Sequence, residues 1–159
     1  MDILRRATFI RAKADEALRK TGQTRPPIDL YAIAKHYGIA VRRGERGERV
    51  VAHYDPGRNE IVLGDNDRWP LAHELGHALL GHGTAQCYEG LVAEDAETPQ
   101  AEFGDDQEAE ANRFARHVLV PREMAEFLLA RGLRIPDLAK RCEVSEKVVW
   151  YALEFYGLV

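Results

Sequence analysis

Cysteine is scarce in this chain of 159 residues, which contains only Cys87 and Cys142. They could form at most one disulfide, and we expect free thiols, as in a reducing compartment. Long hydrophobic runs are also missing, because no stretch approaches the roughly 20 apolar residues that span a membrane. Residues 1–20 are charged throughout and lack the apolar core of a signal peptide. We therefore expect a cytoplasmic protein with no membrane partner.

The chain also lacks an excess of basic charge. Lys and Arg number 22 against 26 Asp and Glu, which gives a net charge of −4. This balance does not favour a nucleic-acid-binding protein. With 45% hydrophobic and 30% charged residues, the composition is that of an ordinary globular protein. At this length we expect one main domain over residues 1–132, followed by a small helical segment over residues 133–159.

The chain does contain a dense apolar stretch that includes histidines and a glutamate, WPLAHELGHALLGH (residues 69–82). Within it, His73, Glu74 and His77 form a His-Glu-x-x-His pattern. Four helical residues turn through about 400°, so the two histidines lie on one face and can bind the same tetrahedral Zn²⁺. Glu74 then lies beside the water of the zinc site as a candidate general base. The alternative is a surface helix with two solvated histidines, which the apolar flanks disfavour.

A third ligand must come from elsewhere, because a catalytic zinc site uses three protein ligands and a water. The helical pattern of residues 106–120 offers Glu108, Glu110, Asn112 and His117. Glu108 and Asn112 share a helix face, so one can bind the metal while the other hydrogen-bonds a ligand imidazole. Glu110 is turned about 200° around the helix axis from Glu108, so it should not reach the same metal ion. We predict Glu108 as the third ligand, with Asn112 supporting a histidine and His117 as a weaker candidate ligand.

The remaining patterns predict an α+β fold. Two β-prone runs, residues 50–54 and 60–63, flank an Asp-Pro-Gly turn and predict a hairpin in a small antiparallel sheet directly before the metal helix. An edge strand of this sheet could pair with the backbone of an extended peptide. Residues 83–105 lack apolar periodicity and predict a mobile rim. The other expected elements are helices over 2–20, 28–37 and 121–131 and a strand over 39–42.

The C-terminal residues 134–156 predict two short helices with Ser145 as the N-cap of the second, an arrangement that resembles a helix-turn-helix. DNA binding through this segment is one alternative. The acidic residues Glu143, Glu146 and Glu154 interrupt any basic surface, so we expect no direct DNA contact. We expect instead a helical cap that packs on the core or engages the partner, with Trp150, like Trp69, in the interior.

Two motifs together, HELGHALLGH (73–82) and EAEANRFARHVLVP (108–121), resemble the ImmA/IrrE family of metallopeptidases. The similarity extends to PIDLYAIAKHYGIAV (27–41), to the strands at 50–63 and to the C-terminal helices. It implies a minimal zincin-like protease domain with a gluzincin-like site. In that site His73, His77 and Glu108 bind Zn²⁺ and Glu74 is the catalytic residue. Mn²⁺ and Fe²⁺ also suit such a donor set.

The resemblance further implies a protein substrate, a transcriptional repressor of the XRE type whose loss switches on mobile-element or stress-response genes. One alternative keeps the same ligands but binds the repressor without cleaving it, as an anti-repressor. A second donor to the oxyanion is usual in such sites. The sequence offers His82, Tyr88, His117 and Tyr54 as candidates without choosing between them.

Overall fold

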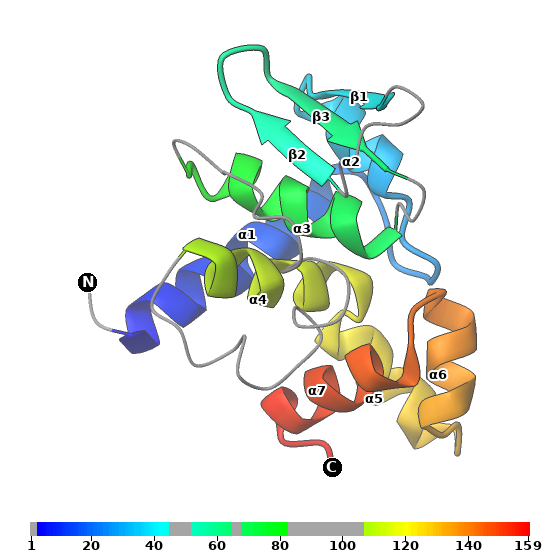
Figure 1. The fold of residues 1–159 in the computed structure, drawn as a ribbon. Coiled ribbons are helices and arrows are strands. Elements are labelled where there is room, and N and C mark those ends of the chain that lie inside the picture. Colours follow the sequence, from blue (N-terminus) through cyan, green and yellow to red (C-terminus); the bar gives the residue numbers. More distant parts are fainter. Residues whose placement is uncertain (1–2, 45–51, 65–67, 83–106) are drawn as a thin grey trace.

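The computed structural model describes residues 3–44, 52–64, 68–82 and 107–159, and Figure 1 shows their arrangement. This part of the chain forms seven helices and a three-stranded sheet, which confirms the predicted α+β class. The elements are α1 (Ile3–Lys20), α2 (Leu30–His36), β1 (Ala40–Arg43), β2 (Ala52–Asp55), β3 (Glu60–Leu63), α3 (Arg68–Leu79), α4 (Gln107–Leu119), α5 (Arg122–Ala130), α6 (Ile135–Cys142) and α7 (Glu146–Tyr156). The predicted mobile rim, residues 83–105, lies outside the described residues.

The sheet has the strand order β1-β3-β2 and is mixed, because β1 adds in parallel to the small antiparallel sheet that was predicted. The predicted hairpin is present, because β2 and β3 pair antiparallel with Ala52 opposite Leu63. Asp55 Oδ1 accepts the backbone N–H of Gly57 at 2.9 Å, which stabilises its turn. The hairpin leaves the other edge of β3 open, and β1 pairs there in parallel. One edge of the sheet is therefore β2, which packs on α3 (Figure 1).

Helix α3 is buried on nearly every side, which explains its apolar sequence. It packs against β2 and β3 on one side and against α4 on another (Figure 1). Trp69, Leu71 and Leu75 belong to the hydrophobic core, as predicted for Trp69. Gly76 sits at a close approach of α3 and α4, because a Cβ there would lie 3.0 Å from the Cα of Ala111. The histidine motif thus lies inside the molecule.

The two C-terminal helices form as predicted. Ser145 caps α7, its hydroxyl accepting the Val148 N–H at 3.2 Å. Trp150 is 46% exposed, so its predicted burial is wrong. The reason is that α7 packs through Val149, Ala152, Leu153 and Tyr156, which turns Trp150 toward solvent.

The C-terminal helices share the core of the rest of the chain, because α7 contacts both α4 and α5. Arg68, at the start of α3, donates to the carbonyls of Ile28 and Cys142 at 2.8 and 2.9 Å. Cys142 is a buried free thiol, and burial raises its pKa to about 11. The division of the chain at residue 132 stays a prediction. None of the described helices has the length and apolar character needed to cross a membrane.

Candidate metal centre

Two helices bring the three predicted ligands together. Helix α3 contributes His73 and His77, and α4 contributes Glu108. His73 Nε2 lies 2.9 Å from Glu108 Oε2, and His77 Nε2 lies 3.1 Å from Glu108 Oε1. One ligand atom from each residue lies within 4.8 Å of the other two, so the group has the composition and spacing to hold a metal ion.

The distance between the two imidazoles supports this interpretation. The Nε2 atoms of His73 and His77 are 3.1 Å apart. Two nitrogens bound to one tetrahedral Zn²⁺ at roughly 2.0–2.1 Å would be separated by about 3.3 Å. Facing lone pairs at this distance repel unless a proton or a cation lies between them. The donor atoms are therefore spaced as a single ion requires.

The second nitrogen of His73 contacts Asn112. His73 Nδ1 lies 2.6 Å from Asn112 Oδ1, and both side chains are buried. Because the amide oxygen of Asn112 can only accept, His73 has a proton on Nδ1 and donates it there, which leaves Nε2 of the neutral ring available to a metal ion. This contact fixes the tautomer and the ring orientation that a metal ligand needs. The geometry suits the supporting role predicted for Asn112, which stays a proposal.

The charges at the site favour a cation. Burial acts to raise the pKa of Glu108, but hydrogen bonds from His73 and His77 outweigh it and hold that pKa far below its ordinary value. Burial acts to lower the pKa of His73, and Glu108, Glu74 and Asn112 together raise it above the usual 6.5. Glu108 is thus an ionised carboxylate facing two imidazoles, the charge arrangement that a divalent metal ion uses.

Glu74 is completely buried, at 0% exposure, on the turn of α3 that includes His73. Its negative charge is one of the influences that raise the pKa of His73. The carboxylate therefore acts on the metal group through a low-dielectric interior. Its assignment as general base remains a proposal.

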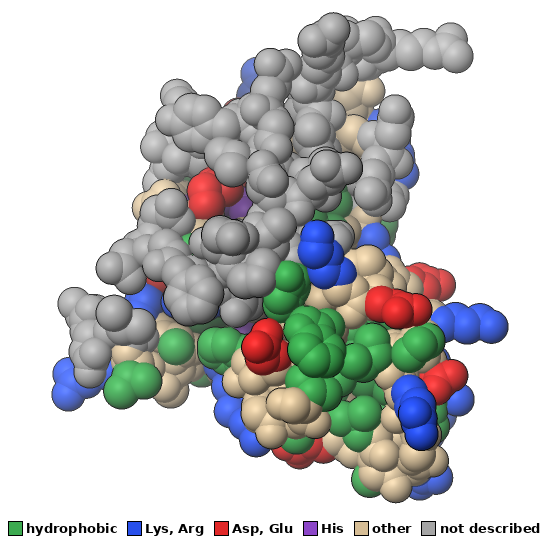
Figure 2. Space-filling model, turned by 60° about the horizontal axis from the view of Figure 1, so that its bottom comes forward, with side chains coloured by type: hydrophobic (Ala, Val, Ile, Leu, Met, Phe, Trp, Pro, Cys, Tyr) green, Lys and Arg blue, Asp and Glu red, His purple; other side chains and the backbone are tan. Residues whose placement is uncertain are grey.

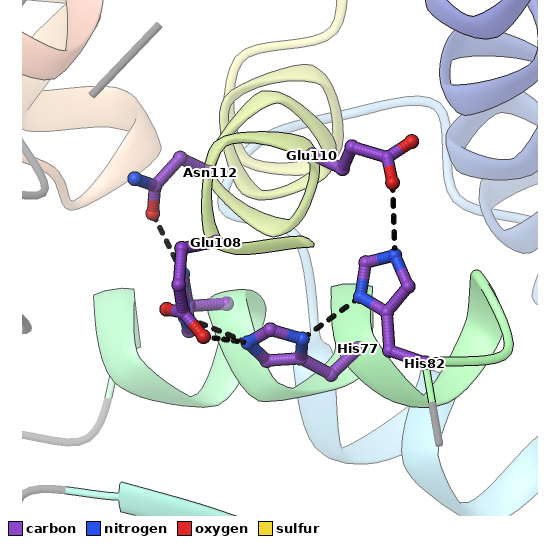
Figure 3. A network of polar contacts seen from close by, with 6 residues as sticks. His77, His82, Glu108, Glu110 and Asn112 are labelled. Atoms are coloured by element: carbon purple, nitrogen blue, oxygen red, sulfur yellow. Dashed lines mark hydrogen bonds and ion pairs between the residues drawn. The ribbon is translucent and has the colours of Figure 1, made fainter. Parts of the chain in front are cut away.

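The sequence did not identify the contacts of His82 and Glu110. His82 follows α3 and is only 4% exposed. Its Nδ1 lies 2.8 Å from His77 Nδ1, and its Nε2 lies 3.2 Å from Glu110 Oε1. Figure 3 shows Glu108 and Asn112 on one side of α4 and Glu110 on the other, as the predicted rotation requires. One feature of the sequence could have predicted the contact of His82 with α3. Gly81 precedes His82, and a glycine at this position is typical of a helix end at which the chain folds back onto the helix.

The other candidate polar residues have partners away from the metal group. His117, the weaker candidate ligand, is not part of that group and lies 3.1 Å from the Tyr156 hydroxyl through its Nδ1. The Tyr54 hydroxyl donates to Asn59 Oδ1 at 2.9 Å. Tyr88 lies outside the described residues. The second oxyanion donor therefore remains unassigned.

Comparison with known proteins identifies a family. A search of curated proteins finds no match. The model of the family Peptidase_M78, described as the IrrE N-terminal-like domain, matches residues 34–154. That match covers well over half of the chain and includes α3, α4 and all three candidate ligands. This chain therefore belongs to the IrrE N-terminal-like family of peptidases, as its two motifs predicted.

Proposed function

We propose that this protein is a zinc-dependent endopeptidase in which His73, His77 and Glu108 hold the ion. The observation that carries the proposal is the convergence of three ligand atoms, within 4.8 Å of one another, from two helices of a peptidase-family domain. Zinc, when bound, activates water at neutral pH and polarises the peptide carbonyl. Mn²⁺ or Fe²⁺ could serve the same donor set.

Three side chains around the ion have separate roles in the proposed reaction. Glu74 takes a proton from the attacking water and later gives it to the departing amine. Its buried position keeps this proton transfer away from bulk solvent. Asn112 holds His73 in the tautomer that presents Nε2. Glu108 stays ionised because both imidazoles lie against its carboxylate.

The position of β2 at the end of the described sheet supports a peptide substrate. Among the described strands, β2 pairs only with β3, and it packs on the metal helix α3. An extended peptide can add to such an edge through backbone hydrogen bonds, with little dependence on its side chains. The segment of a protein substrate would then run beside the metal centre. The family resemblance points to an XRE-type repressor as that protein, whose cleavage would derepress mobile-element or stress-response genes.

The test uses the purified protein with Zn²⁺ and an XRE-type repressor encoded beside it. We expect the repressor to be converted into two defined fragments. Glu74→Gln keeps the size of the side chain but cannot accept the proton, so it should retain zinc and lose at least about 100-fold in cleavage rate. Zinc content and fragment formation are both measured. Cleavage by Glu74→Gln at the full rate would contradict the mechanism.

The same experiment separates cleavage from capture. A stable complex of intact repressor with the zinc-loaded wild type, equally stable with Glu74→Gln, would indicate an anti-repressor that binds without cleaving. DNA binding is not favoured, because the face of the C-terminal helices in Figure 2 mixes acidic, basic and hydrophobic side chains. On α7, Lys147 lies between Glu146 and Glu154 rather than in a basic stripe.

A further inference from the structure

A chain of polar contacts extends from the metal ligand His77 to the first helix. His82 lies between His77 and Glu110, and Glu110 in turn forms an ion pair with Arg6 of α1. We propose that His82 is a positioning residue for His77, and that Glu110 and Arg6 hold it in place. The inference rests on the metal centre proposed above and adds three residues to its support.

The direction of the hydrogen bonds follows from a single constraint. His77 presents Nε2 to Glu108 and His73, so a metal ligand at this position needs its proton on Nδ1. That Nδ1–H then donates to His82 Nδ1 over 2.8 Å. His82 must therefore have its own proton on Nε2, which faces Glu110 Oε1 at 3.2 Å. Each group has the partner that its assigned tautomer requires.

The end of α3 explains why His82 reaches His77. The His82 N–H donates to the His77 carbonyl at 3.0 Å, and the Gly81 N–H to the Ala78 carbonyl at 3.4 Å. This pair of bonds, with Gly81 at φ +74°, is a Schellman motif. In that motif the residue after the glycine contacts the residue five positions earlier. The pair in contact is commonly apolar, but here it consists of two imidazoles.

Glu110 and Arg6 make the support rigid. The Glu110 side chain is 10% exposed, and Arg6 Nη2 donates to its Oε1 at 3.2 Å, beside a second contact from Arg6 Nε. A carboxylate behind an imidazole orients the ring and increases the basicity of the ligand in front of it. The two histidine ligands therefore have different supports: an amide for His73, and a histidine with a carboxylate for His77.

The test is zinc affinity, measured by competition with a chromogenic chelator, together with the visible spectrum of the Co²⁺-loaded protein. His82→Leu keeps the apolar contact that a Schellman motif accepts but removes both hydrogen bonds. We expect zinc binding about 10- to 100-fold weaker and an altered Co²⁺ spectrum. In His82→Gln the amide can accept from His77 and donate to Glu110, so affinity should return to within about threefold of the wild type.

A matched control is His117→Gln, which changes another buried histidine of the same core. His117 contacts Tyr156 and not the metal group, so this variant should bind zinc as the wild type does. If His82→Leu does not fold, Glu110→Met tests the same chain from its other end. It removes the carboxylate that His82 contacts and should weaken zinc binding about 10-fold.

Two results would overturn the proposal in different ways. If His82→Leu folds and matches the wild type in zinc affinity and Co²⁺ spectrum, His82 does not position the ligand. The same conclusion follows if His82→Gln is as impaired as His82→Leu. If the wild type itself binds no zinc, the metal centre proposed above is wrong. The role of His82 as a positioning residue for His77 is then wrong as well. Wild-type zinc binding thus separates the failure of one proposal from the failure of the other.

Discussion

His117 shows how a single buried side chain can make stability depend on pH. It is 5% exposed, and its Nδ1 faces the Tyr156 hydroxyl, which itself donates to the Val120 carbonyl at 2.7 Å. Burial, together with the positive charges of Arg11, Arg116 and Arg113, lowers its pKa to about 4. The folded protein therefore keeps this imidazole neutral under mildly acidic conditions, while an unfolded chain would protonate it.

The sign of the resulting pH effect follows from these values. Between the unfolded pKa near 6.5 and the folded pKa of about 4, the unfolded chain binds more protons, so stability falls as the pH falls. At pH 5 the loss amounts to about 2 kcal/mol relative to pH 7.5. Urea unfolding at both pH values measures it, and His117→Gln should reduce the difference by that amount. An unchanged pH dependence in this variant would contradict the assignment.

At the scale of elements, the metal group depends on how closely α3 and α4 pack. The histidines belong to one helix and Glu108 to the other, so the separation of the two axes sets the distance between the ligands. Gly76 permits that separation, because a Cβ there would meet the Ala111 Cα and carbonyl oxygen at 3.0 Å and the Phe114 Cβ at 3.2 Å. The first two obstacles are backbone atoms, which move only if the helices move apart.

Gly76→Ala tests this packing. Alanine favours a helix over glycine by up to about 1 kcal/mol, whereas overpacking a close helix contact costs about 1–3 kcal/mol. We expect a net loss of stability in urea unfolding without metal, together with weaker zinc binding because Glu108 moves away from the histidines. A variant that is more stable than the wild type and binds zinc equally well would show that the helices do not need this close approach.

At the scale of the whole molecule, a metal ion would join parts of the chain that are far apart in sequence. His73 and Glu108 are 35 positions apart and share the centre through separate helices. An ion that binds the folded state and not the unfolded state raises the free energy of unfolding. The increase grows with the logarithm of the ratio of the ion concentration to Kd. The metal centre should therefore contribute to the stability of the whole fold.

Addition of Zn²⁺ at about 100 times its Kd should stabilise the protein by about 2.7 kcal/mol, and EDTA should reverse the gain. Thermal unfolding with and without the metal measures the shift. The control is Glu108→Ala, which lacks the third ligand and should respond far less to zinc. An equal response in wild type and variant would place the bound zinc somewhere other than this centre.

The sequence by itself determined much of the metal helix and its partner helix. A helical repeat of 3.6 residues requires that His73 and His77, and likewise Glu108 and Asn112, lie on common faces. The apolar density around the first motif predicted that it would be buried, and Asp-Pro-Gly predicted the hairpin. These features depend on interactions between residues a few positions apart, which a sequence displays directly.

Only the tertiary structure decided the features that join distant segments. The parallel pairing of β1 with β3 depended on which edge the hairpin left open. The exposure of Trp150 depended on which face of α7 met the core. The contacts from Arg6 through Glu110 and His82 to His77 unite α1, α4 and the end of α3. No local periodicity encodes such contacts, because they form only when separately folded elements pack against one another.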